Sequence, residues 1–112
     1  GGTTIKPGDY NGDIYLTVTD ELMAQSGACN LYRTAILIED GKYVPGKSVA
    51  AAVQGGMVND KATTGVSISS NEYNFEGIIV KGNSEYTIDG VNIYLESDQT
   101  DKGGNDFIGF GS

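Results

Sequence analysis

The stretch GVSISSNEYNFEGIIVKGNSEYTIDGVNIYLES, residues 65–97, contains the pattern from which the fold can be predicted. Its first four residues, GVSI at 65–68, recur as GVNI at 90–93. A second pair of segments follows in the same order, because NFEGI at 74–78 is matched by DFIGF at 106–110. We infer one structural unit that occurs twice. The polar segment ESDQTDKGG, residues 96–104, lies inside the second copy as an insertion.

The segments between these matches are predicted to be short strands separated by tight turns. Apolar and aromatic residues gather at 78–80, 86–88 and 91–95, and turn residues separate them at 82–84 and 89–90. Glycine and asparagine suit such corners because they tolerate left-handed backbone geometry. A repeat of roughly 20 to 50 residues is typical of solenoids, in which each unit buries its apolar face against the next. Three short strands in each unit indicate a parallel β-helix.

The segments GIIVKGNSEYTIDGVNIYL, residues 77–95, and GGNDFIGFGS, residues 103–112, resemble the coils of right-handed parallel β-helix proteins of the pectate-lyase-like group. The resemblance covers about residues 65–112. It implies an all-β chain in which residues 1–64 form an N-terminal β-rich cap and residues 65–112 form the first coils. A cap is expected because an uncovered first coil would present open strand edges. The alternative is that the repeat is accidental and the chain is a small β-sandwich.

The N-terminal half contains weaker local signals. Asn11-Gly12 predicts a β-hairpin, and Asp40-Gly41 predicts a turn between two strands. Residues 19–28, TDELMAQSGA, are the one segment with helix start and stop signals. The small apolar run 49–53 fits either a buried strand or a short helix.

Composition excludes several functional classes. The net charge is −8 and the seven basic residues are scattered, which argues against nucleic-acid binding. The chain has no histidine, so Ser-His-Asp and Cys-His catalysis and histidine-ligated zinc cannot come from these residues. The single cysteine, Cys29, allows no intrachain disulfide. No apolar run reaches the roughly 20 residues that span a bilayer.

The acidic insertion offers candidate metal ligands. Asp98, Asp101 and Asp106 are oxygen ligands close together in sequence, a ligand type that suits Ca²⁺. Their spacing is not that of an EF-hand loop. The alternative is an acidic loop that is simply solvated.

Three other residues are candidates for substrate binding. Tyr86 and Tyr94 could stack on a sugar ring, and Arg33 could pair with an anionic substrate. The alternatives are that tyrosine is merely a good strand residue and that a lone arginine is merely solvated. The possible acids of a catalytic carboxylate pair are Asp9, Asp13, Glu76 and Asp89, but no pattern in the sequence pairs any two of them.

The resemblance implies a subunit or processed fragment of a β-helix enzyme, a lyase or hydrolase acting on carbohydrate or a similar polyhydroxylated compound. No catalytic residue of such enzymes can be matched, so the chain would complete the scaffold and cleft. The alternatives are a non-catalytic surface β-solenoid or adhesin and a carbohydrate-binding β-sandwich. Because a solenoid needs about three units or more, a second polypeptide or another copy of the chain is expected to continue the stack. The acidic, Tyr-, Asn- and Gly-rich composition favours a secreted or cell-surface bacterial protein.

Overall fold

The structure is a computed structural model that describes residues 2–16, 33–72 and 75–95. These residues form short strands and two 3₁₀ helices, so the all-β prediction is confirmed for this part of the chain. The elements are β1 (Thr3–Thr4), β2 (Gly8–Asn11), β3 (Ile14–Leu16), β4 (Arg33–Glu39), β5 (Lys42–Tyr43), η2 (Pro45–Lys47), η3 (Ala50–Ala52), β6 (Val53–Gln54), β7 (Met57–Val58), β8 (Ala62–Thr64), β9 (Ser67–Ser70), β10 (Phe75–Lys81), β11 (Glu85–Asp89) and β12 (Asn92–Leu95).

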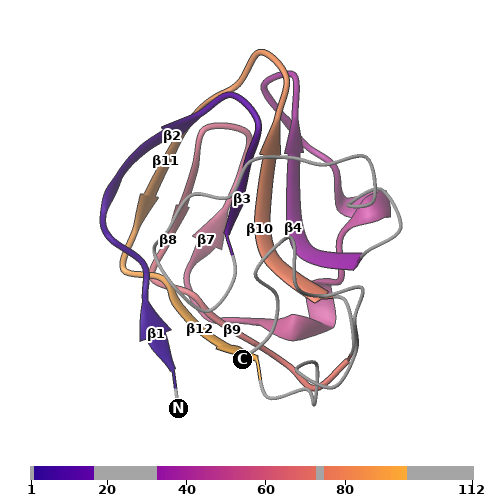
Figure 1. Ribbon diagram of the computed structural model, residues 1–112, viewed down its shortest axis with the longest axis vertical. Coiled ribbons are helices and arrows are strands. Elements are labelled where there is room, and N and C mark those ends of the chain that lie inside the picture. The colour runs from indigo at the N-terminus through magenta and orange to yellow at the C-terminus, as the bar shows by residue number, and fades with distance from the viewer. Residues whose placement is uncertain (1, 17–32, 73–74, 96–112) are drawn as a thin grey trace, which may run out of the picture.

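The strands form three four-stranded sheets (Figure 1). Sheet A has the order β1-β12-β9-β6, sheet B the order β2-β11-β8-β7, and sheet C the order β3-β10-β4-β5. In every sheet the two central strands are parallel, namely β12 with β9, β11 with β8 and β10 with β4. The edge strands on both sides are antiparallel to their neighbours. Regions 1–64 and 65–112 both contribute strands to all three sheets.

Successive strands of the C-terminal part lie in different sheets. The chain passes from β10 in sheet C to β11 in sheet B and β12 in sheet A, and β4, β8 and β9 follow the same order. The first three strands pass through the sheets in the opposite order, so that β1, β2 and β3 pair antiparallel with β12, β11 and β10. The edge of β10–β12 that faces away from β4, β8 and β9 is therefore already paired by the N-terminal strands.

The repeated tetrapeptides lie side by side, as the sequence predicts. Residues 67 and 68 of the first copy pair in parallel with residues 92 and 93 of the second. Backbone hydrogen bonds extend the match, because Gly65 N donates to Asp89 O at 2.9 Å and Asn92 N donates to Val66 O at 3.0 Å. The other half of the repeat cannot be compared, since residues 74 and 106–110 lie outside the described residues.

Two predicted turns have different outcomes. Asp40 (φ 50°) and Gly41 (φ 79°) connect the antiparallel strands β4 and β5, so this turn is confirmed. The hairpin predicted at Asn11-Gly12 is wrong, because β2 pairs with β11 and β3 pairs with β10. Gly12 (φ 91°) instead turns the chain from sheet B to sheet C. Residues 49–53 include the 3₁₀ helix η3, one of the two conformations expected there, whereas the predicted helix at 19–28 and Cys29 lie outside the described residues.

The core lies between the three sheets and is built mainly from isoleucine. Side chains alternate between the two faces of a strand, so core residues recur at every second position in most strands. The two central strands of sheet C, β4 and β10, contribute core residues of both parities. Gly77 lies where β10 meets this core, and a Cβ at that position would lie 2.5 Å from the Ile93 Cδ1 atom, so Ile93 would have to shift. The largest fully buried apolar core side chains are Ile5, Leu16, Ile36, Ile38, Ile68, Phe75, Ile78, Tyr86, Ile88 and Ile93.

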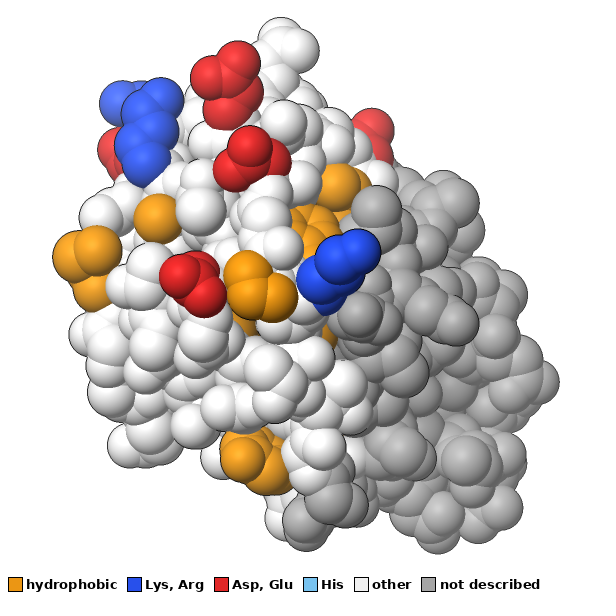
Figure 2. Space-filling model, turned by 90° about the vertical axis from the view of Figure 1, so that its left-hand side faces the viewer, with side chains coloured by type: hydrophobic (Ala, Val, Ile, Leu, Met, Phe, Trp, Pro, Cys, Tyr) orange, Lys and Arg blue, Asp and Glu red, His pale blue; other side chains and the backbone are white. Residues whose placement is uncertain are grey.

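The outward side chains give the three sheets different surfaces. Face A, on sheet A, is polar and uncharged and consists of Thr4, Gln54, Ser67, Ser69, Asn92 and Tyr94. Face B, on strands β2 and β11, is acidic and consists of Asp9, Asn11, Glu85, Thr87 and Asp89. Figure 2 looks onto the side of the molecule where β2 and β11 lie and shows acidic side chains among single basic ones. Face C, on sheet C, is buried and consists of Tyr15, Leu37 and Ile79, which strand register aligns with one another.

Candidate ligand-binding face

Tyr94 is the most accessible aromatic side chain of face A. Its neighbours in β12, Ile93 and Leu95, point into the core, so strand alternation places Tyr94 outside, where its side chain is 37% exposed. The ring lies against the backbone of Gly2, since a Cβ added there would be 2.0 Å from the Tyr94 Cε1 atom. This contact covers part of the ring and leaves the rest open to solvent.

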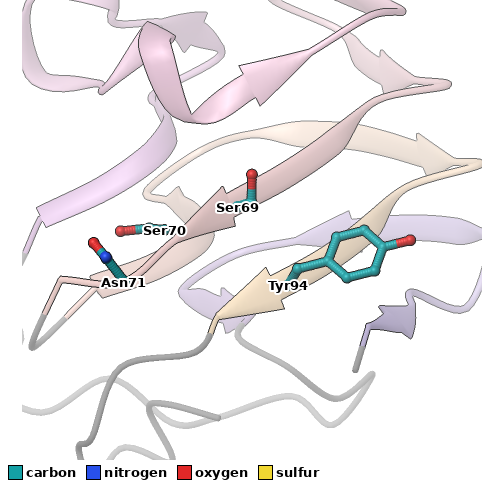
Figure 3. Close-up of a pocket in the computed structure, with 4 residues that line it drawn as sticks. All are labelled: Ser69, Ser70, Asn71 and Tyr94. Atoms are coloured by element: carbon teal, nitrogen blue, oxygen red, sulfur yellow. The ribbon is translucent and has the colours of Figure 1, made fainter.

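A shallow depression of about 340 Å³ lies beside this ring and is lined by Ser69, Ser70, Asn71 and Tyr94. Ser69 and Tyr94 are register partners on the parallel strands β9 and β12. Figure 3 shows the Ser69 hydroxyl and the Tyr94 ring projecting from these neighbouring strands, with Ser70 and Asn71 at the end of β9. The depression therefore combines an aromatic surface with hydroxyl and amide groups that both donate and accept hydrogen bonds.

A row of four polar side chains crosses face A next to this depression. Strand register aligns Thr4 with Asn92, Asn92 with Ser67, and Ser67 with Gln54, so the row includes one residue from each strand of sheet A. The Thr4 hydroxyl donates a hydrogen bond to Asn92 Oδ1. This bond orients the Asn92 amide so that its Nδ2 group remains available as a donor at the surface.

Arg33 lies at the start of β4, and its charge is matched by a neighbour. Its guanidinium Nη1 forms an ion pair with Glu72 Oε1, and both side chains are exposed. Exposed pairs of this kind contribute little to stability. The Glu72 carboxylate neutralises the positive charge of Arg33, the residue that the sequence suggests could pair with an anionic substrate.

Tyr86 occupies the interior and not the surface. It lies in β11 and is 1% exposed, and its hydroxyl donates a hydrogen bond to Asn59 O at 3.0 Å. The hydroxyl groups of Thr63 and Tyr86 are also hydrogen-bonded to each other, with 2.6 Å between their oxygens. Burial raises the pKa of Tyr86 to about 12. A ring enclosed in this way presents no face to a sugar, so the structure does not bring Tyr86 and Tyr94 together in one site.

The candidate Ca²⁺ ligands Asp98, Asp101 and Asp106 lie outside the described residues. Among residues 2–16, 33–72 and 75–95, no group of three or more His, Cys, Asp or Glu side chains is placed to hold a metal ion. The same residues include no helix that is long and apolar enough to cross a membrane.

Two of the candidate acids have ordinary structural partners. Asp9 accepts a hydrogen bond from the Thr87 hydroxyl at 3.0 Å, and Asp13 accepts one from Gly82 N at 2.9 Å. Asp89 is exposed at the end of β11. The three carboxylates therefore all lie at the surface.

Glu76 is different, because its carboxyl group is fully buried. The side chain is 0% exposed, and within the described part of the chain neither carboxyl oxygen has a hydrogen-bond partner. Glu76 lies in β10 at the centre of sheet C and is aligned with the buried Thr34 of β4. Burial raises the pKa of this carboxyl to about 9. Glu76 is therefore protonated at neutral pH, which nothing in its sequence position predicts.

The chain matches no protein-family model, no curated protein and no solved structure. Its function must therefore be argued from the fold and from the chemistry of its surfaces.

Proposed function

We propose that this chain is a carbohydrate-binding module and that Tyr94 on face A is its principal contact with the ligand. The observation that carries the proposal is the position of the Tyr94 ring, which is partly exposed, held against Gly2, and next to the Ser69 hydroxyl. A sugar ring has apolar faces and polar edges. The Tyr94 ring complements the faces, and the Ser69 hydroxyl complements the edges. A tyrosine ring that already packs against the backbone loses less conformational entropy on binding than one that projects freely into solvent.

The remaining acidic groups favour binding over catalysis. Glycoside hydrolysis requires two carboxyl groups that flank the scissile bond. Asp9 and Asp89 lie on face B, whereas the carboxyl of Glu76 is buried in sheet C. The described part of face A contributes no carboxylate to the Tyr94 depression. We therefore assign this part of the chain a binding role, as in the non-catalytic alternative considered for the sequence.

We also propose that the fold is a short parallel β-helix with antiparallel strands at both ends. The support is that β4, β8 and β9 pair in parallel with β10, β11 and β12, one pair in each sheet. The antiparallel edge strands take the place of further coils. A second polypeptide or a second copy of the chain that continued the stack would have to pair with these outer strands.

Affinity gel electrophoresis with a panel of soluble neutral and anionic polysaccharides tests the binding role. Replacing Tyr94 with alanine is expected to weaken binding about tenfold, because a stacking contact of roughly 1.5 kcal/mol is lost. Tyr94→Phe retains the ring and should bind nearly as well as the wild type. Thr87→Ala, on face B, is a matched surface control. Equal binding by Tyr94→Ala and the wild type, or no binding to any polysaccharide of the panel, would refute the proposal.

A further inference from the structure

The uncharged character of face A indicates which class of carbohydrate it fits. The outward side chains of β1, β12, β9 and β6 are hydroxyl, amide and phenol groups, in a chain whose net charge is −8. Face B carries the contrasting acidic side chains. Among the residues that the structure describes, face A carries no acidic side chain. Face A therefore suits an uncharged ligand.

The groups on face A are poorly suited to an anionic ligand. Carboxylates and sulfates are recognised by arginine or lysine through charge-assisted hydrogen bonds. The one arginine of the chain, Arg33, is already paired with Glu72. Hydroxyl and amide side chains both donate and accept hydrogen bonds, and so do the hydroxyl groups of a neutral sugar.

The geometry of face A favours a polymer over a single sugar. Small ligands are usually held in deep pockets that bury most of their surface, whereas the Tyr94 depression is shallow. The row Thr4, Asn92, Ser67 and Gln54 crosses all four strands of the sheet. Neighbouring strands are about 4.8 Å apart, so the row offers hydrogen-bonding groups at regular intervals along an extended chain. Several weak contacts along one polymer add to the overall affinity.

We propose that the ligand of face A is an uncharged polysaccharide whose chain lies across the strands of sheet A, with one sugar against Tyr94 and its neighbours along the Thr4–Asn92–Ser67–Gln54 row. This inference rests on the proposed carbohydrate-binding function and specifies its ligand class. Thr4 is part of the recognition because its hydroxyl fixes the orientation of the Asn92 amide.

The test compares neutral polymers (glucomannan, xyloglucan and hydroxyethylcellulose) with anionic ones (polygalacturonate and alginate) at 50 mM and 500 mM NaCl. The wild type is expected to bind at least one neutral polymer with an affinity that changes less than about twofold with salt, because no charge pairing is involved. Ser67→Ala and Gln54→Ala are each expected to weaken that binding about threefold to tenfold, the effect of one neutral hydrogen bond. Thr87→Ala on face B should bind as the wild type does.

Two results would overturn the inference and leave the binding function intact. One is binding that depends on Tyr94 but is selective for an anionic polymer and weakens steeply with salt. The other is neutral binding that depends on Tyr94 but is unchanged in both Ser67→Ala and Gln54→Ala. If the wild type binds none of the polymers, the proposed function fails together with the inference. The salt comparison uses the wild type alone, so it remains decisive if a variant folds poorly.

Discussion

Replacing Glu76 with glutamine should remove an unusual dependence of stability on pH. The carboxyl is fully buried, and burial raises its pKa from 4.5 to about 9 in the folded protein. Below pH 4.5 the group is protonated in both the folded and the unfolded chain, so the folded state loses nothing. Between pH 4.5 and 9 only the unfolded chain ionises, and the free energy of unfolding falls as the pH rises.

The size of this effect follows from the displacement of the pKa. Each pH unit within the window costs about 1.4 kcal/mol, so the wild type is expected to lose about 4 kcal/mol of stability between pH 5 and pH 8 through this one group. That is a large fraction of the roughly 5–15 kcal/mol that stabilises a typical domain. Glu76→Gln cannot ionise and should lack this loss, so it should be more stable than the wild type at pH 8 and similar to it at pH 5.

Urea denaturation followed by far-ultraviolet circular dichroism at the two pH values measures the difference. Glu85→Gln is the matched control, because it makes the same chemical change at an exposed position on face B, and the contrast between the two variants isolates the effect of burial. Glu76→Leu removes the ionisable group and also the buried polar atoms that lack hydrogen-bond partners, whereas Glu76→Gln removes only the ionisable group. The difference in stability between the two variants therefore measures the cost of the unmet hydrogen bonds, and Glu76→Leu should be at least as stable as Glu76→Gln at pH 8. If the wild type and Glu76→Gln lose equal stability between pH 5 and pH 8, the reasoning about a neutral buried carboxyl is refuted.

Two further substitutions test the core. Gly77→Ala should destabilise the protein by roughly 1–3 kcal/mol, because the new methyl group would overlap Ile93. Gly46→Ala is the control and should change the melting temperature little, because a Cβ at Gly46 would meet no side chain or backbone atom within 4 Å beyond its chain neighbours. Equal melting temperatures for the two variants would contradict this packing. Tyr86→Phe should cost roughly 1–3 kcal/mol in urea denaturation, because the Asn59 carbonyl loses its buried donor, and it should leave polysaccharide binding unchanged. Loss of binding in Tyr86→Phe with unchanged stability would show that the Tyr86 hydroxyl contributes to the ligand site and not to the core.

The sequence predicts the central strands well because their signals are local. The apolar runs at 78–80, 86–88 and 91–95 and the glycine and asparagine turns between them correspond to β10, β11 and β12. The repeated tetrapeptide predicts the parallel pairing of β9 with β12, since equal segments occupy equivalent positions in stacked units. These features depend on residues that are close in the chain or alike in sequence.

The antiparallel N-terminal strands could not be predicted in the same way. Alternation of apolar and polar residues shows which side of a strand is buried, but it does not show the direction of the neighbouring strand. Asn11-Gly12 provides the left-handed geometry of a tight turn, and the same geometry serves a hairpin or a corner between two sheets. The pairing of β2 with β11 and of β3 with β10 decides between them, and those partners are distant in sequence.

The alternation of apolar and polar residues along each strand indicates that Tyr86 is buried and Tyr94 is exposed. In β11, Tyr86 shares its face with Ile88, and both are buried, whereas the alternate residues are polar. In β12, Tyr94 shares its face with Asn92 and alternates with the buried Ile93. Residue type alone does not distinguish the two tyrosines, whereas their positions in the alternation assign Tyr86 to the core and Tyr94 to the surface. Glu76 has no such signal, because the polar residue on an otherwise apolar strand is expected to face solvent.

The same register that builds the core of sheet A also defines its proposed binding face. A shift of β12 by one residue would move Tyr94 and Asn92 inward and expose Ile93, because side chains alternate with a period of two. Pairing on both sides opposes such a shift, since β12 is aligned with β9 through the repeated segment and with β1 through residues 3 and 4. The hydrogen bond between Thr4 and Asn92 connects the outward side chains of β1 and β12 in that one register. The edge strand β1 therefore bears on the proposed recognition as well as on covering the sheet, because Thr4 orients the Asn92 amide and Gly2, which precedes β1, lies against the Tyr94 ring.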